Sequence, residues 1–139
     1  MIPNKIIIHH SLTKDDKNLS WGAIRKYHIE TNGWKDIGYQ FGIELINDHY
    51  EILIGRRPDL IGAHTIGQND QSIGICVVGN FDVDPVTEDI KDALQKLLVW
   101  LMPLYRISSK EIHGHCEYAA KTCPGKNLMD WIKEIGDRG

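Results

Sequence analysis

The densest group of reactive side chains lies in the segment HGHCEYAAKTCPG, residues 113–125. It holds two histidines, two cysteines, one glutamate and one lysine. Imidazole nitrogen and thiolate sulfur are the ligands that zinc prefers in proteins. The spacing from His115 to Cys123 allows a loop to bring both side chains onto one ion, so this segment is a candidate metal site.

Two ligands do not make a tight site, and the adjacent pair His9–His10 is the obvious source of a third. Because side chains alternate along a strand, only one of the pair can face a given side. Three protein ligands leave the fourth tetrahedral position for water, which is typical of catalytic zinc. The spacing alone leaves the alternative open that the histidine at the strand end is a hydrogen-bonded core residue and Cys123 a small apolar one.

Composition fits one globular domain spanning residues 1–139, with 42% apolar and 25% charged residues. The formal net charge of −3 argues against nucleic acid as the main partner. Three cysteines cannot all pair within one chain, which favours reduced thiols or metal ligation. The longest apolar stretch, residues 97–104, is too short to span a bilayer and contains Pro103. The N-terminus lacks the apolar core of a secretory signal, so synthesis in the cytoplasm is expected.

Strands are predicted where β-branched and apolar residues cluster, over residues 6–10, 38–46, 50–54 and 72–79. The turn at residues 47–49 predicts a hairpin, the run at 72–79 is typical of a central strand, and Glu111–Ile112 is expected to be a short edge strand. Residues 55–71 have no hydrophobic period and are rich in Gly, Pro, Asn and Asp. They predict a long loop, and loops of this length are usually functional.

Helical spacing predicts a first helix from about Trp21 to Thr31, with Ser20 as its N-cap. A second helix, capped by Thr87, carries an apolar stripe from Ile90 through Leu104. A short final helix carries apolar residues at positions 128, 131, 132 and 135. Strands and helices in this order predict an α/β fold with a mixed central sheet flanked by helices.

Five blocks, IIIHHSLT, GWKDIGYQFGI, GRRP, GAHTIGQNDQSIGICVVGNF and HGHCEYAAKTCPG, occur in an order that resembles a known family. The chain is similar, from about Ile6 to Trp131, to zinc-dependent N-acetylmuramoyl-L-alanine amidases of the second type. These include short phage lysozyme-type amidases and share their fold with the peptidoglycan recognition proteins. The resemblance implies hydrolysis of the amide between N-acetylmuramic acid and L-alanine in peptidoglycan.

The resemblance also assigns site residues. It implies that His9, His115 and Cys123 bind one zinc ion per chain, and that Tyr39 and Lys121 are the catalytic residues. A related cytoplasmic branch has an aspartate as its third ligand, so Cys123 argues against that branch. Lys121 brings the chain closer to the phage and bacterial members, because animal recognition proteins often carry threonine there.

These residue types suit amide hydrolysis, because zinc activates water and polarises the carbonyl. Lys121 is the candidate for stabilising the oxyanion, and Tyr39 is expected to hydrogen-bond the zinc-bound water or the intermediate. Without the family resemblance, Tyr39 is more simply a packed strand residue and Lys121 a solvated loop charge.

Three further residues are predicted to bind the muropeptide. His64 and Asn69 match a family segment at the substrate groove, and Arg56, with Arg57 beside it, suits a stem-peptide carboxylate. For the two arginines, a solvated loop is an equal alternative. His10 and His113, next to the predicted ligands, are expected either to hydrogen-bond to them or to be exposed to solvent. Cys76 and Cys116 are expected to be structural thiols. His28 and Trp34 are expected to belong to the first helix and its exit.

The sequence therefore predicts a phage- or prophage-type endolysin that is a monomer, acts on the cell wall after release, and has no nucleic-acid or membrane partner. The first alternative is a recognition module that binds peptidoglycan without cutting it. The second is a cysteine hydrolase that uses Cys123 or Cys116 with a histidine base. The complete set of ligands, together with Tyr39 and Lys121, favours catalysis.

Overall fold

The computed structural model describes residues 1–12 and 20–138, so the end of the IIIHHSLT block at Thr13 lies outside the described part. Strands and helices follow one another much as the hydrophobic patterns predict. Their bounds are β1 Lys5–His10, α1 Trp21–Glu30, β2 Phe41–Ile46, β3 His49–Ile54, β4 Ser72–Val77, α2 Glu88–Tyr105, β5 Ile112–Gly114 and α3 Lys126–Arg138, with 3₁₀ turns η1 Ser109–Glu111 and η2 His115–Glu117 on either side of β5.

Within the described residues, five strands form one mixed sheet in the order β3-β2-β4-β1-β5. β2, β4, β1 and β5 run parallel to one another, and β3 pairs antiparallel with β2 through the predicted hairpin. β4 is buried along its length, as expected for a central strand. β5 is the predicted edge strand, and its partner is β1, with Ile8 opposite Gly114. The carboxyl ends of β1 and β5 are therefore neighbours.

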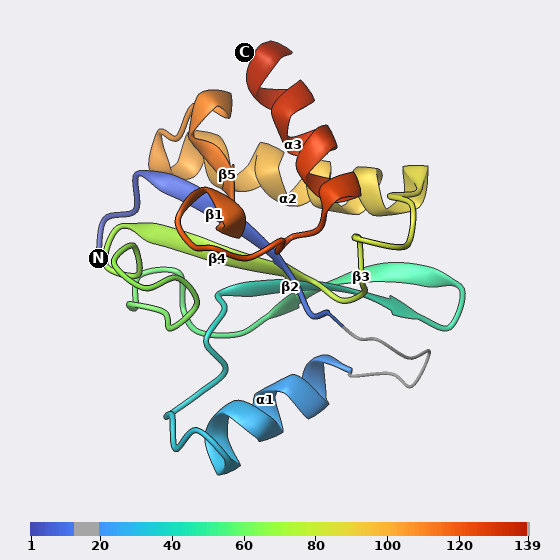
Figure 1. The fold of residues 1–139 in the computed structure, drawn as a ribbon. Coiled ribbons are helices and arrows are strands. Elements are labelled where there is room, and N and C mark those ends of the chain that lie inside the picture. The colour runs from blue at the N-terminus through green and yellow to red at the C-terminus, as the bar shows by residue number, and fades with distance from the viewer. Residues whose placement is uncertain (13–19, 139) are drawn as a thin grey trace.

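Helices cover both faces of the sheet (Figure 1), which confirms the predicted α/β fold class. α2 and α3 lie over one face, and α1 lies under the other. The larger core joins Ile6 and Ile8 of β1 to Leu94 of α2 and Leu128 of α3. The smaller core lies on the α1 side and contains Trp21, Ile24, Ile37 and Cys76.

α1 is fixed against β2 at its first turn. The Ser20 hydroxyl accepts a hydrogen bond from the Ala23 amide at 3.1 Å, which confirms the predicted N-cap. The Trp21 amide donates to the Glu44 carboxylate of β2 at 2.9 Å. A Cβ at position 42 would lie 2.3 Å from the Trp21 ring, so the glycine there lets the indole pack directly on the strand.

α2 begins at the predicted cap, where Thr87 Oγ1 accepts from the Ile90 amide at 3.4 Å. Its apolar stripe is buried from Ile90 to Leu101, but Leu104 is 55% exposed. The predicted stripe is therefore wrong at its last position, and in the last turn Met102 and Tyr105 pack against the larger core instead. In the part of the chain that the structure describes, no helix has the length and hydropathy needed to cross a membrane.

β2 starts at Phe41 rather than at the predicted Gly38. The preceding backbone is held both by β4, where the Gln40 amide donates to the Gly74 carbonyl at 3.0 Å, and by the loop of residues 55–71. Gly55 donates to the Gln40 carbonyl at 2.8 Å, and Arg56 donates to the Tyr39 carbonyl at 3.0 Å. This pairing links Tyr39 to the long loop that carries the other predicted substrate-binding residues.

Candidate metal centre and its cavity

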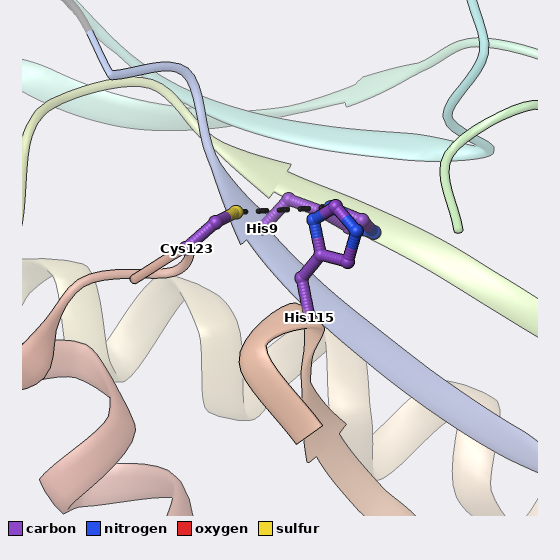
Figure 2. A group of neighbouring side chains, drawn as sticks. All are labelled: His9, His115 and Cys123. Atoms are coloured by element: carbon purple, nitrogen blue, oxygen red, sulfur yellow. Dashed lines mark hydrogen bonds between the residues drawn. The ribbon is translucent and has the colours of Figure 1, made fainter. Parts of the chain in front are cut away.

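Three side chains from distant parts of the chain meet where β1 and β5 end. One ligand atom from each of His9, His115 and Cys123 lies within 4.8 Å of the others. Figure 2 shows them turned toward one another from β1, from the turn after β5 and from the loop before α3. His9 Nδ1 is 3.8 Å from Cys123 Sγ, and the two imidazole centroids are 4.6 Å apart. Tetrahedral zinc with bonds of about 2.0–2.3 Å holds neighbouring ligand atoms about 3.5 Å apart, so these residues fit one zinc ion.

Strand alternation decides between the two adjacent histidines, as predicted. His9 shares a register position with Cys76 of β4, on the face away from the larger core. His10 points to the opposite face, where its Nδ1 accepts from the Phe81 amide at 3.1 Å. The backbone amide of His10 nevertheless donates to Cys123 Sγ at 3.4 Å. His10 therefore supports a ligand through its backbone, while His9 supplies the side chain.

The loop that carries Cys123 is fixed on both sides of that residue. The Cys116 amide donates to the Cys123 carbonyl at 2.7 Å. Asp82 accepts from the Thr122 hydroxyl at 2.7 Å and from the Lys126 amide at 3.2 Å. One carboxylate thus joins the residue before Cys123 to the first residue of α3, which fixes the thiol beside β1.

A second carboxylate fixes the turn that carries His115. Glu117 Oε2 accepts from the Gly114 amide at 2.8 Å, and Glu117 Oε1 lies 3.1 Å from His113 Nδ1. The other nitrogen of His113 faces Glu111 at 3.3 Å. His113 therefore lies between two carboxylates, outside the cavity, and acts on His115 only through this turn.

The protonation states favour metal binding by the histidines. Burial lowers the pKa of His9 well below its ordinary 6.5, and the nearby His64 and His115 lower it further. Burial, followed by the Lys121 charge, lowers the pKa of His115. Both imidazoles are therefore neutral near pH 7. Burial raises the pKa of Cys123 to about 12, so a metal must displace a proton from this thiol.

A cavity of about 760 Å³ opens at these three side chains. Cavities of this size hold small-molecule ligands or parts of larger ones. Its described wall contains no aspartate or glutamate, and Lys121 is the cationic residue in it. Of the predicted site residues, the wall brings together His9, Tyr39, His64, Asn69, His115, Lys121 and Cys123, but not Arg56.

Tyr39 lies beside the first ligand, with its ring centroid 5.1 Å from that of His9. Burial, followed by the nearby Cys76 and Cys123, raises the pKa of Tyr39 well above 10. The phenol is therefore protonated at all ordinary pH values and can donate a hydrogen bond. Lys121, in contrast, is exposed, and its charge acts on both ligand imidazoles.

The structure gives two of the predicted substrate-binding residues contacts within the protein. His64 Nδ1 lies 3.0 Å from His9 Nε2, which brings His64 directly behind a candidate metal ligand. Asn69 Oδ1 accepts from the backbone amides of His64 and Thr65, both at 2.9 Å. Both side chains line the cavity, so contact with substrate stays a prediction alongside these structural contacts.

Arg56 has a structural position. Its guanidinium donates to the carbonyls of Ile37 at 2.9 Å, Ile61 at 2.8 Å and Asp36 at 3.4 Å. It thus ties the long loop to the segment before Tyr39. Arg57 is exposed and pairs with a nearby acid, which agrees with the solvated alternative. Substrate binding by Arg56 stays a prediction, and it would require this guanidinium to leave its carbonyl partners.

Sequence reasoning missed part of the cavity wall. His28 and Trp34, assigned to the first helix and its exit, both line the cavity, and their ring centroids are 4.7 Å apart. His28 Nδ1 accepts from the Gly38 amide at 3.0 Å, next to Tyr39. The closeness of Trp34 to Tyr39 in sequence could have indicated this. Thr65, also in the wall, is an isolated loop threonine and gave no signal.

Comparisons with known proteins agree with this geometry. The profile of the N-acetylmuramoyl-L-alanine amidase family matches residues 1–126. An endolysin from Escherichia phage T7 is 35% identical over 144 residues, covering 96% of this chain and 91% of the relative.

Two solved structures are also similar. The N-acetylmuramoyl-L-alanine amidase LysC from Clostridium intestinale URNW superposes with a TM-score of 0.82 at 31% identity, covering 99% of this chain and 85% of LysC. A chain from the ectodomain complex of the peptidoglycan recognition proteins LCa and LCx, to which tracheal cytotoxin is bound, superposes with a TM-score of 0.82 at 28% identity, covering 96% of this chain and 82% of that chain.

The fold and the cluster of His9, His115 and Cys123 define an α/β protein with a candidate metal site. The matched profile and the relatives narrow this class, and the chain belongs to the N-acetylmuramoyl-L-alanine amidase family. The resemblance seen in the sequence and the expected enzyme class, an amidase acting on peptidoglycan, are thereby confirmed.

Proposed function

We propose that this chain is an endolysin-type enzyme that uses one zinc ion, held by His9, His115 and Cys123, to cleave N-acetylmuramoyl-L-alanine amide bonds. The observation that most directly supports this proposal is that the three ligand atoms lie within 4.8 Å of one another in the wall of an open cavity. Three protein ligands leave the fourth position of zinc free, which is the pattern of catalytic sites. Family membership supports the reaction, and the donor set supports the metal.

When bound, zinc supplies a Lewis acid that lowers the pKa of a water ligand to about 7 and polarises the amide carbonyl. His9 and His115 are neutral, so each has an unprotonated ring nitrogen that can coordinate the ion. Lys121 faces the cavity and stabilises the negative charge that develops on the carbonyl oxygen. Tyr39 stays protonated and donates a hydrogen bond in the site, so no role as a base is assigned to it.

The substrate is expected to occupy the cavity along the loop that carries His64 and Asn69. A wall without aspartate or glutamate does not repel the carboxylates of a peptide substrate. Trp34 and Tyr118 supply aromatic surfaces, which can pack against sugar or peptide groups. The similarity to a phage endolysin supports action on the cell wall after release, and a monomer stays the expected state.

The test combines metal analysis with a cleavage assay, and two cysteines of the same neighbourhood provide matched variants. The wild-type protein should bind one equivalent of zinc and release free amino groups from peptidoglycan. A chelator should abolish this activity, and added zinc should restore it. Cys123→Ala should lose both zinc and activity, whereas Cys116→Ala should keep both, because the hydrogen bond from Cys116 to the Cys123 carbonyl comes from its backbone amide, which alanine retains.

The alternatives give different outcomes. Binding to cell walls without release of amino groups would identify a recognition module. Activity that survives full removal of metal but is lost on alkylation would identify a cysteine hydrolase. Protection of Cys123 from alkylation by zinc would argue for the metal enzyme.

A further inference from the structure

We propose that His64 and Thr65 are positioning residues that fix the tautomer and orientation of His9, and so set the affinity of the centre for its metal. The proposal rests on the zinc site proposed above. It gives His64 a role behind the metal ligand, in place of the direct substrate contact that the sequence predicted. It also assigns a role to Thr65, which sequence reasoning did not identify.

The two nitrogens of His9 face in different directions. Nδ1 lies 3.8 Å from Cys123 Sγ, on the side of the metal centre. Nε2 lies 3.0 Å from His64 Nδ1 and 3.2 Å from the Thr65 hydroxyl oxygen. That hydroxyl is in turn 2.9 Å from His64 Nδ1, so the three polar atoms form a closed triangle behind the ligand.

Counting protons fixes the arrangement once Nδ1 of His9 binds the metal. A neutral imidazole whose Nδ1 is a ligand must carry its proton on Nε2. That proton is donated either to His64 Nδ1 or to the Thr65 oxygen. In the second case the Thr65 hydroxyl donates onward to His64 Nδ1. In both cases His64 Nδ1 accepts, so one protonation pattern serves the whole triangle.

The surroundings hold this triangle in place. Thr65 is only 2% exposed, so water does not compete for its hydroxyl. The side-chain oxygen of Asn69 accepts from the backbone amides of both residues at 2.9 Å. A Cβ at position 74 would lie 2.5 Å from the His64 ring, so Gly74 of β4 provides the space for it.

Partners behind a metal-bound histidine commonly decide how well it binds. They fix its tautomer and ring orientation, and their loss typically costs about 10–100-fold in metal affinity or activity. A residue that contacts only the substrate would have a different effect, because its loss would raise KM and leave zinc affinity unchanged.

Two double variants separate these roles. Thr65→Val with His64→Leu removes both acceptors, whereas Thr65→Ser with His64→Asn retains an oxygen near each position. We expect the apolar pair to bind zinc at least about tenfold more weakly than wild type, and the polar pair to stay within about threefold. Zinc affinity is measured by competition with a chelator, and thermal unfolding of the metal-free proteins checks that both variants fold.

Equal zinc affinity in the two double variants would overturn the proposal, even if both variants lost activity. A rise in KM in both variants with unchanged zinc affinity would return His64 to a substrate-binding role. If the apolar pair does not fold, Thr65→Val against Thr65→Ser gives the same comparison with a smaller expected change. A wild-type protein that binds no zinc would refute the metal site itself, which is a distinguishable failure.

Discussion

Replacing Lys121 by methionine tests the electrostatic part of the proposed mechanism without removing a metal ligand. Methionine keeps much of the length and apolar surface of the side chain but removes its charge. Lys121 is exposed, so its replacement should change the free energy of unfolding by less than about 0.5 kcal/mol. Any large loss of activity then reflects the missing charge in the cavity.

The expected magnitude follows from the position of Lys121. A single oxyanion donor contributes about 2.7–4 kcal/mol to lowering the barrier. Because Lys121 is solvent-exposed, its charge is partly screened, and we expect the lower end of this range. At about 1.36 kcal/mol per factor of ten, kcat should fall about 100-fold. KM should change little, since the charge acts mainly on the developing oxyanion.

The direction in which zinc affinity changes provides an independent test of the role of Lys121. The Lys121 charge lowers the pKa of His9 and His115, which means that it disfavours positive charge at the metal position. Its removal should therefore leave zinc affinity unchanged or increase it. A positioning role for Lys121 in the loop would instead weaken zinc binding.

The assay follows release of amino groups from a soluble muropeptide, with zinc affinity measured by competition with a chelator. Lys126→Met is the matched control, because Lys126 is a nearby exposed lysine that does not line the cavity. It should retain wild-type turnover. Full activity of Lys121→Met, or a loss of zinc equal to its loss of turnover, would refute the oxyanion assignment.

Two further predictions concern residues around the ligands. Tyr39→Phe keeps the ring beside His9 but removes the hydroxyl, so zinc should stay bound while kcat falls by about tenfold or more, and unchanged kcat would contradict the proposed donor. Asp82→Ala removes both hydrogen bonds that flank Cys123, so zinc affinity should fall about tenfold, whereas Asp84→Ala in the same loop should match wild type in the same chelator assay.

The main elements of the fold are predictable because their signals are local. Ser20 and Thr87 were correctly identified as caps, since a cap depends on contacts within the next three residues. The start of β2 was wrong because residues 38–40 bond to the long loop, and nothing within the strand sequence reports that pairing. The exposure of Leu104 was also not predictable from local sequence, because the burial of a helix position depends on which distant segments pack against it.

In the site, too, some residues are indicated by the local sequence and others depend on how distant segments pack together. Residue types indicated metal chemistry around His115 and Cys123, and strand alternation limited the third ligand to one of two histidines. The choice of His9 over His10 comes from the family resemblance, and it is the His9 ring that lies near His115 and Cys123 in the structure. The position of His64 behind His9 was not predictable, because it depends on how a loop without any period packs over β4.

Each of the three proposed ligands has its own set of contacts, which would hold the site in place before a metal binds. The His10 amide holds Cys123 Sγ, Glu117 fixes the turn before His115, and His64 lies behind His9. These contacts come from different elements, and the two cores of the protein pack without the ligands' help. A metal ion bound by these residues would therefore complete a centre whose geometry the fold already supplies, unlike a zinc finger, where the ion supplies the folding free energy. On this argument the ion mainly contributes chemistry, and the positioning contacts decide how tightly the centre holds it.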